Sequence, residues 1–371
     1  MKLNVAANDL SSALVKVQTV VPNRTTLPIL ETILFDATGD KLTVTASSID
    51  MEASATVPCE IVEPGKAAIS ANIVGIVKAL GKKDLSIDAS GSGRAVVNGS
   101  RQKYEFGTLD PEQFPIMARV ASDKAAATFE LPAADLKAAL DATRNTSSTL
   151  ETQFFLNGVC MCLDGRDLAF VSTDKHRFSR FLMPLPDGAD RVRSHIIPSP
   201  AVAAFVGMLD RVQGSARVTV SDVAISVEAD GAFAASKLVA GEFLNYRAQV
   251  AALPNDKGLR VTASELSEAV SRIISLRAET KAPVVTLTPN GSSIELASDK
   301  RGRNEGREVV DAEIVAETPE FSVSTTYLAG LLATWPESAS LDIAAPLSGG
   351  PITITSPSVP GLFQLVMPMT P

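Results

Sequence analysis

The chain has 371 residues, is 45% hydrophobic and carries a formal net charge of −8 at pH 7. No apolar run reaches about 18 residues, so we expect no membrane-spanning helix, and the start reaches Asn8 and Asp9 too early for a signal peptide. The chain has only two histidines, His176 and His195, which are too few for most histidine-based metal sites or catalytic triads. We therefore expect a cytoplasmic protein. Its acidic balance argues against tight binding of nucleic acid through phosphates.

The first predicted elements are a strand and a helix. Leu3 and Val5 are two residues apart, as on one face of a strand. From Leu10 onward apolar residues recur every three or four positions, as on one face of a helix. Asp9 falls in the first turn, where the helix dipole favours an acid. The pattern predicts a strand followed by an amphipathic helix over 8–20.

A strand pair and a second helix follow. Residues 31–39 and 41–50 alternate apolar and polar side chains and meet at Gly39 and Asp40, which is typical of an antiparallel hairpin. Residues 72–83 are predicted to form a second helix. Its apolar stripe consists of Ile73, Ile76, Val77 and Leu80.

Both helical patterns recur twice. The strand-to-helix pattern has equivalent leucines at Leu10, Leu136 and Leu266, which are separated by 126 and 130 residues. The second helix recurs over 199–211, with Val202, Phe205, Val206 and Leu209, and over 325–337, with Leu328, Leu331, Leu332 and Trp335. A repeat of this length is a domain and is too long for a solenoid unit.

We predict three repeated α+β domains, each with two helices on antiparallel sheets, over residues 1–121, 122–252 and 253–371. Polar stretches near 119–124 and 253–257 are the expected hinges. The six predicted helices carry a net charge of +2, against −10 for the remainder. Either their exposed faces form a weakly basic functional surface, or they are simply the less acidic part that any acidic protein has.

The cysteines do not indicate a metal site. Cys59 stands alone, and Cys160 and Cys162 alternate with Met161 and Leu163 in an apolar run. This pattern predicts buried thiols on a strand. The sequence also lacks a P-loop, a dinucleotide fingerprint, a paired-histidine motif and a nucleophile elbow, so we expect no metal and no cofactor.

The polar run at 173–177, Thr-Asp-Lys-His-Arg, is the best catalytic-looking cluster. Residues adjacent in sequence cannot all converge on one point, so a binding loop or strand end is favoured over catalysis, with solvated surface as the alternative. A hydrolase using Asp174 and His176 is a remote hypothesis. The basic run at 300–304 is interpreted as a solvated turn.

Several segments carry a resemblance when they are taken together: TLPIL at 26–30, FFLNGV at 154–159, STDKHRF at 172–178, SKLVAGEFLNYR at 236–247 and VMPM at 366–369. In this order, over the full length, the chain resembles the bacterial DNA sliding clamp, the β subunit of DNA polymerase III. The resemblance implies a DNA-clamp fold and a head-to-tail homodimer ring, with helices around the hole and sheets outside. It also implies a non-catalytic processivity factor that encircles duplex DNA without sequence specificity.

The resemblance further implies that DNA polymerase and clamp-loader subunits bind through short peptide motifs, in a groove between the second and third domains. The residues that would line it are Leu156, Thr173, Lys175, His176, Arg177, Phe178, Leu244, Val250, Tyr327, Leu365, Val366, Met367, Pro368 and Met369. A groove lined by Met and Leu suits several partners. The chain departs from the family where Lys175 replaces a frequent glycine, where Leu244 replaces the usual proline, and at its Thr370-Pro371 end.

The resemblance and the exposed helix faces also predict residues that contact DNA and residues of the ring interface. The expected DNA contacts are Arg24, which matches a family position, and Lys16, Lys78, Lys137, Arg144, Arg211, Arg272 and Arg277. The expected ring interface pairs Tyr104 and Phe106 of one chain with Ile273, Ile274 and Leu276 of another, although simple core packing is the alternative for each. A ring holds DNA by topology, so weak contacts are enough. A scaffold that keeps the fold without loading onto DNA remains the second hypothesis.

Overall fold

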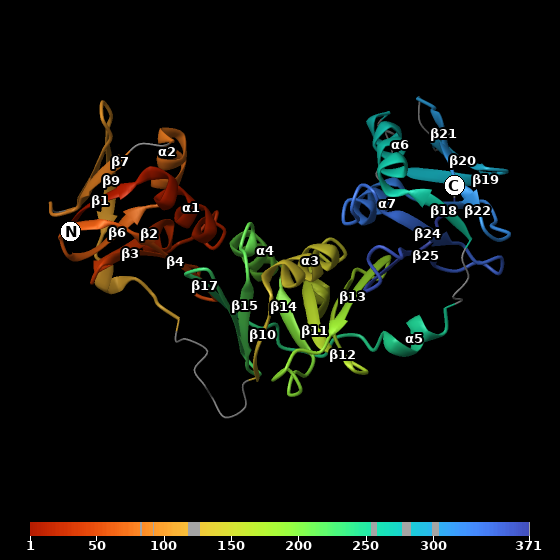
Figure 1. Ribbon diagram of the computed structural model, residues 1–371, viewed down its shortest axis with the longest axis horizontal. Helices are drawn as coiled ribbons and strands as arrows, with labels where there is room; N and C mark the ends of the chain where they lie inside the picture. The colour runs from red at the N-terminus through yellow and green to blue at the C-terminus, as the bar shows by residue number, and fades with distance from the viewer. Residues whose placement is uncertain are drawn as a thin grey trace. The chain divides into compact units, whose positions relative to one another are not determined.

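The computed structural model describes residues 1–81, 84–91, 93–117, 127–253, 258–276, 283–298 and 304–370. These residues form two compact units, one of residues 1–138 and 186–240 and the other of 139–185 and 241–371 (Figure 1). Arg277, the expected hinges from 119 to 124 and from 254 to 257, most of the 300–304 run and Pro371 lie outside the described residues. Among the described helices, none is long and apolar enough to cross a membrane.

The first unit is built on one antiparallel sheet with helices packed on it. The sheet order is β10-β15-β16-β17-β4-β3-β2-β6-β9-β8-β7-β1-β5. Helix α1 packs against α2 and α4 (Figure 1). The elements are β1 Lys2–Ala6, α1 Ala7–Gln18, η1 Pro28–Glu31, β2 Thr32–Thr38, β3 Lys41–Ser47, β4 Met51–Pro58, β5 Glu60–Glu63, β6 Gly65–Ser70, α2 Ile73–Leu80, β7 Asp84–Asp88, β8 Arg94–Asn98, β9 Lys103–Leu109, η2 Pro111–Gln113, β10 Ala127–Pro132, β14 His195–Pro198, α4 Ser199–Leu209, β15 Ser215–Val220, β16 Ala224–Ala229 and β17 Ala232–Lys237.

The second unit has two antiparallel sheets, ordered β11-β12-β13-β26-β25-β24-β18-β22 and β21-β20-β19-β23. Helix α6 packs against α7, and helix α3, Ala133–Arg144, belongs to the first unit up to residue 138 and to the second from 139. The other elements are η3 Glu151–Leu156, β11 Gly158–Asp164, β12 Asp167–Thr173, β13 Arg177–Pro184, α5 Arg247–Ala251, β18 Leu259–Thr262, α6 Ala263–Ser275, β19 Val284–Asn290, β20 Ser293–Ser298, β21 Arg307–Asp311, β22 Glu313–Ile314, β23 Phe321–Ser324, α7 Thr325–Leu332, β24 Ser340–Ala344, β25 Ile352–Thr355 and β26 Leu362–Val366.

The strand-to-helix repeat has the predicted local structure in all three copies. Strands β1, β10 and β18 lead directly into α1, α3 and α6. The equivalent apolar positions are all buried: Leu3, Val5, Leu10, Ala13 and Leu14; Phe129, Leu131, Leu136, Ala139 and Leu140; Leu259, Val261, Leu266, Ala269 and Val270. The acids of the first turns, Asp9, Asp135 and Glu265, are exposed. The fold class α+β is confirmed.

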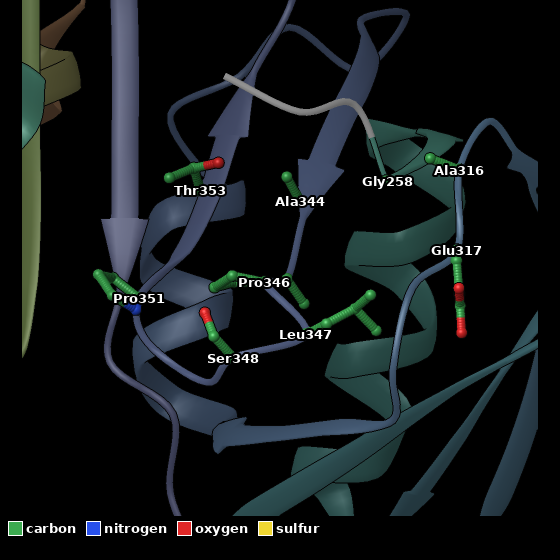
Figure 2. A pocket seen from close by; sticks show the side chains of 10 residues that line it. Gly258, Ala316, Glu317, Ala344, Pro346, Leu347, Ser348, Pro351 and Thr353 are labelled. Carbon is green, nitrogen blue, oxygen red and sulfur yellow. The ribbon is translucent and has the colours of Figure 1, made fainter. Parts of the chain in front are cut away.

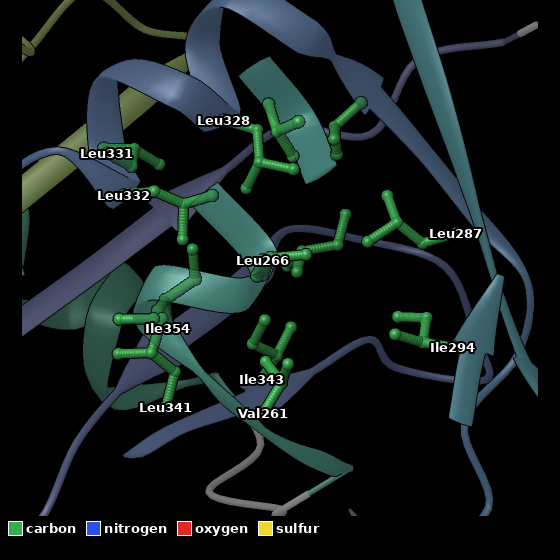
Figure 3. Close-up of a cluster of buried hydrophobic side chains, with 14 of the residues drawn as sticks. Val261, Leu266, Leu287, Ile294, Leu328, Leu331, Leu332, Leu341, Ile343 and Ile354 are labelled. Atoms are coloured by element: carbon green, nitrogen blue, oxygen red, sulfur yellow. The ribbon is translucent and has the colours of Figure 1, made fainter. Parts of the chain in front are cut away.

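The core around α6 illustrates how one copy of the repeat is filled. Figure 3 shows Leu266 of α6 among side chains from α7, including Leu328, and from the strands of both sheets, including Leu287 and Ile343. Each of these four side chains is at most 3% exposed. Burying a leucine of this kind stabilises a fold by about 1.5–3 kcal/mol, so this face fixes the helix on its sheets.

The sheets run continuously from one predicted domain to the next. Strand β17 pairs with β4, with Ala234 opposite Ala53, and β13 pairs with β26, with Phe178 opposite Leu365. The two compact units therefore do not coincide with the predicted boundaries, because each unit includes one of these junctions. The boundaries at residues 121 and 252 stay a prediction.

Helices α1 and α4 end at Gln18 and Leu209, each two residues earlier than predicted. Two larger differences concern α7 and α5. Helix α7 ends at Leu332, so Trp335 lies beyond it, although its side chain is buried at 6% exposure. Pro336 disfavours helical backbone in the residue before it, which accounts for the early end. The short helix α5 was not predicted, because five residues with one large apolar side chain, Val250, are too few to show a helical period.

A buried glutamine joins β26, β13, α3 and the segment that follows α7 in the second unit. Gln364 on β26 is fully buried. Its Oε1 accepts a hydrogen bond from Trp335 Nε1 at 2.7 Å, and its Nε2 donates to Thr334 Oγ1 at 2.9 Å and to Ser179 Oγ at 3.2 Å. The same Nε2 lies 3.5 Å from the carbonyl of Ala142 on α3. Every polar atom of this side chain therefore has a partner, as buried polar groups require.

Candidate functional site

The run at 173–177 forms the tight turn between β12 and β13. Thr173 Oγ1 accepts from the Lys175 amide at 3.0 Å and donates to the Arg177 carbonyl at 2.6 Å. Asp174 Oδ1 accepts from the amides of His176 and Arg177 at 2.9 and 2.7 Å. Its Oδ2 accepts from Arg177 Nε and Nη2 at 3.0 and 2.8 Å. The carboxylate is thus committed to holding the turn, which speaks against a general base at Asp174.

Lys175 has a φ of +73°, in the left-handed region that favours glycine. We expect Lys175→Gly to stabilise the protein by about 0.5–1 kcal/mol, because relief of the left-handed backbone exceeds the entropy that glycine adds to the unfolded chain. Urea unfolding measures the change. Lys175→Ala is the matched control: it removes the same charge but keeps the backbone cost, so an equal gain in both variants would contradict the backbone explanation.

One face of the turn packs on α7. The Arg177 guanidinium carbon lies 4.4 Å from the centre of the Tyr327 ring, and the His176 ring stacks on the same tyrosine at 6.0 Å between centroids. A Cβ at Gly330 would approach Arg177 Nη1 to 3.2 Å, so glycine keeps this position open for the arginine. Cation–π contact and the bond to Asp174 together fix Arg177 on this face.

The opposite face of β13 carries an apolar cluster. Because successive strand residues point to opposite faces, Phe178 points away from Arg177. It packs 5.5 Å from the ring of Tyr246 and 6.3 Å from that of Phe363. Val250 and Leu365 pack partly buried against the same cluster.

The tail continues β26 and is hydrogen bonded on both sides. The Met367 amide donates to the His176 carbonyl at 2.8 Å, and the Met369 amide donates to the Ser322 carbonyl at 2.8 Å. Met367 is 39% exposed and Pro368 is exposed. The tail therefore lies against both the turn and β23 while presenting side chains to solvent.

The structure thus brings most of the predicted groove residues to one strand pair, β13 and β26, on its two faces. Leu156 and Val366 are fully buried and can support this surface only from beneath. Leu244 is 41% exposed in the segment before α5. The sequence reasoning did not single out Tyr246, Phe363 or Ser322. Tyr246 lies within the NYR of the resemblance, which was the available signal for it.

A separate cavity of about 590 Å³ lies in the second unit (Figure 2). Its lining includes Gly258, Pro346 and the 65% exposed Leu347, and Glu317 is the one charged side chain among its lining residues. None of the predicted site residues lines this cavity.

The predicted DNA-contact cations are mostly paired with carboxylates. In the first unit, Lys16 lies 3.7 Å from Asp230, and Lys137 and Arg211 lie 3.2 and 3.6 Å from Asp210. In the second unit, Arg144 lies 2.8 Å from Asp141, and Arg272 lies 2.8 Å from Glu308 and 3.4 Å from Glu268. A hydrogen bond from Arg272 lowers the pKa of Glu308.

Arg24 and Lys78 are exposed and make no ion pair with any residue that the structure describes. Exposed ion pairs are worth at most about 1 kcal/mol, so the exposed cations Arg144, Arg211 and Arg272 remain available to an anion at low cost.

The predicted interface residues lie near two sheet edges. Tyr104 and Phe106 are on β9, whose residues up to Gly107 pair with β8 on one side only among the described strands. Ile273 is 6% exposed, and Ile274 and Leu276 pack partly buried against the core cluster of Leu266. Phe106 is likewise only 9% exposed within the single chain.

Two family models match the chain. One, the N-terminal domain of the DNA polymerase III beta subunit, matches residues 1–118, and the other, the central domain of the same subunit, matches residues 130–245. Together these two models of one subunit cover more than half of the chain. The chain belongs to the DNA polymerase III beta subunit family. This family is that of the bacterial sliding clamps, which are processivity factors of replication and are not enzymes.

Full-length relatives agree with the family. The chain is 29% identical over 378 aligned residues to the beta sliding clamp of Caulobacter vibrioides, covering all of both chains. It is 27% identical over 335 residues to that of Escherichia coli K12, covering 90% of each.

Solved structures agree on the fold. One is a crystal structure of the Caulobacter crescentus beta sliding clamp, which has polyethylene glycol bound at a region proposed to tether a beta motif. It matches with a TM-score of 0.84 at 27% identity, over 100% of this chain and 99% of that chain. The Bartonella birtlesii clamp bound to griselimycin matches with a TM-score of 0.87 at 24% identity, over all of both chains. The DNA-clamp fold and the family resemblance are confirmed.

Proposed function

We propose that this chain acts in the cytoplasm as a homodimeric DNA sliding clamp that encircles duplex DNA and tethers polymerase, clamp-loader and other client subunits through short peptides. The observation that carries the proposal is the full-length match to beta sliding clamps, together with the clamp fold. No catalytic step is part of the proposal: Asp174 is engaged by Arg177 and by two amides of its own turn.

Ring closure would join two sheet edges. Strand β21 is an edge strand whose Val309 is 65% exposed, and β9 has an unpaired side from Lys103 to Gly107 among the described strands. Addition of the β21 edge of one chain to the β9 edge of another is heterologous and can close into a ring. Tyr104 and Phe106 would then face the end of α6, where Ile274 lies.

Contacts with DNA would be weak. A helix of about 12 residues is roughly 18 Å long, and that length of duplex presents on the order of 10 phosphates. Arg24 and Lys78 can approach phosphates directly, whereas Lys16 or Arg272 must share its carboxylate partner. Such contacts would centre the duplex without fixing a position along it.

The client peptide would lie along β26 and the tail. Exposed Met367 and half-buried Leu365 offer apolar contacts, Tyr327 and His176 offer an aromatic face, and Leu244 adds an apolar rim. A short extended peptide with apolar anchors suits this chemistry.

Topological retention tests the ring. We expect the clamp, once loaded by the clamp loader of its own organism, to stay on closed circular DNA in high salt and to be lost about ten-fold or more after the circle is linearised, because high salt removes phosphate contacts but not a topological link. Gel filtration of labelled clamp and DNA measures the retained fraction. Equal retention on both forms would refute the ring, and a sedimentation mass of one chain at micromolar concentration would favour a scaffold instead.

A further inference from the structure

The first unit repeats the backbone framework of the client-peptide surface, which the second unit forms from β13, β26 and the tail. The turn between β3 and β4 holds Ile49 at a φ of +71°, and the turn between β12 and β13 holds Lys175 at +73°. These two residues are 126 positions apart, as are Leu10 and Leu136. A β-branched residue is rare at positive φ, so the shared turn geometry and not residue preference places Ile49 there. The two turns therefore occupy equivalent places in successive repeats.

Two backbone hydrogen bonds recur with the turn. The amide of Lys237, the last residue of β17, donates to the Asp50 carbonyl at 2.9 Å, and the amide of Val239 donates to the Ile196 carbonyl at 2.9 Å. In the second unit, the two hydrogen-bonded tail amides donate in the same way to the turn and to β23. The segment that follows β17 is thus held as the tail is held, between the turn and the strand that precedes α4.

A cavity of about 600 Å³ lies beside this segment. Its lining comes from the residues after α1, the turn between β3 and β4, the start of α4 and the end of β17. The apolar side chains of this lining include Val20, Val21, Met51, Pro198 and Leu238. All of these residues belong to the first unit, so the cavity is complete within one compact part of the protein.

Two differences between the repeats account for the open space. In the second unit, the Arg177 guanidinium packs on the Tyr327 ring at 4.4 Å. The equivalent positions of the first unit, 126 residues earlier, hold Met51 and Ala201. Alanine has no ring to fill the space, and methionine is a flexible side chain that adapts to irregular apolar groups. The first unit can therefore accept a large apolar side chain where the second unit packs its own arginine and tyrosine.

The rim of the cavity carries a lysine where the tail has an apolar residue. Lys237 makes the hydrogen bond to its turn that Met367 makes in the second unit. The Nζ of Lys237 lies 2.7 Å from Asp50 Oδ1, and the two side chains are 56% and 69% exposed. An exposed pair of this kind is worth at most about 1 kcal/mol, and an ammonium group has three donors. Lys237 can therefore bind the carboxylate of a ligand as well as that of Asp50.

We propose that this cavity is a second peptide site, which binds an extended client segment with a large apolar side chain next to an acidic residue. The inference rests on the proposed function of the first site, because the same turn and the same two hydrogen bonds frame both. The apolar lining receives the large side chain, and Lys237 selects the acid. The first site offers Met367 and an aromatic face instead, so the two sites prefer different peptides.

The methyl signals of two methionines report the two sites separately. Met51 lines the cavity, and Met367 is exposed in the tail. The full-length protein is labelled with ¹³C at its methionine methyl groups, and the variants Met51→Leu and Met367→Leu assign the two signals by NMR. The probes are the capped pentapeptide Gly-Leu-Asp-Phe-Gly and its matched control Gly-Leu-Lys-Phe-Gly.

We expect the aspartate peptide to shift the Met51 signal saturably and to bind at least about five-fold more tightly than the lysine peptide, because only its acid can pair with Lys237. Lys237→Glu should reverse this preference. Leu238→Asp should weaken binding of the aspartate peptide by at least about ten-fold, because it places a charge in the apolar lining. Val62→Asp is the matched control. Val62 is 53% exposed on β5 and does not line the cavity, so affinity should stay within about two-fold.

An unchanged Met51 signal with both peptides, or equal affinities for them in both the wild type and Lys237→Glu, would overturn the inference. So would a Met51 shift caused by a short DNA duplex but by neither peptide, or by a rise in protein concentration alone, since the occupant would then be DNA or a second copy of the chain. The first site is tested apart from this result. If a peptide with the clamp-binding segment of the replicative polymerase leaves the Met367 signal unshifted, the proposed client surface is wrong, whatever the Met51 signal shows.

Discussion

Gln364→Leu is expected to lower the free energy of unfolding by about 3–5 kcal/mol. The substitution keeps the side-chain volume nearly constant but leaves the buried Trp335 Nε1 and Ser179 Oγ without the partner they have at 2.7 and 3.2 Å. Thr334 Oγ1 loses its 2.9 Å bond to Gln364 but still donates to the Leu331 carbonyl. Each buried polar group left unsatisfied costs about 1–3 kcal/mol. Urea denaturation at fixed protein concentration measures the loss, because dimerisation makes apparent stability concentration-dependent.

A double-mutant cycle measures the coupling between Gln364 and Trp335. Trp335→Phe removes one orphaned donor, so the double variant Gln364→Leu with Trp335→Phe should lose less than the sum of the two single variants. Gln18→Leu, at an exposed position on α1, is the matched control and should change stability by no more than about 0.5 kcal/mol. A Gln364→Leu variant as stable as that control would show that the network contributes nothing net.

Deletion of residues 367–371 is expected to weaken client-peptide binding by about 100-fold or more. The deletion ends the chain at Val366, the last residue of β26, so the strand pair is kept. It removes the exposed Met367 and Pro368 together with the hydrogen bonds to His176 and Ser322. Loss of apolar contacts of this size amounts to about 3 kcal/mol, and each 1.4 kcal/mol is about ten-fold.

Deleting only residues 370 and 371 is the control for that truncation. Thr370 is exposed and follows the last hydrogen-bonded tail residue, Met369. We expect the affinity for a client peptide to be within about two-fold of that of the full chain. The fluorescence anisotropy of a labelled client peptide measures the affinity of both truncated proteins. If the longer truncation binds the peptide as tightly as the shorter one, the tail is not part of the client surface.

The local elements of the fold could be read from residue spacing because they depend on short-range periodicity. The step of three and four from Leu10, Leu136 and Leu266 predicted three helices, and the equivalent apolar positions of the three copies are all buried. Helix α5 could not be predicted in this way, since a single turn contains no period and is positioned by distant partners, Asp164 and Cys162.

Contacts between residues far apart in the chain could not be predicted from residue spacing. Arg177 meets Tyr327 across 150 positions of sequence, and their proximity on one face was available only through the family resemblance. The ion pairs on the helix faces show more clearly what could not be predicted from the sequence. The net charge of the helices was known, but the carboxylates of Asp230 and Glu308, which lie outside those helices, could not be assigned to Lys16 and Arg272.

These ion pairs have a consequence for movement along DNA. A cation that leaves Asp230 or Asp210 for a phosphate exchanges one anionic partner for another, so the energy changes little as successive phosphates pass. In the proposed complex with DNA, the protein's own acids would replace part of the dissolved counterions, and fewer ions would be released on contact. Carboxylates placed in this way would keep the interaction energy nearly constant along the duplex, so diffusion along it would meet only small energy barriers.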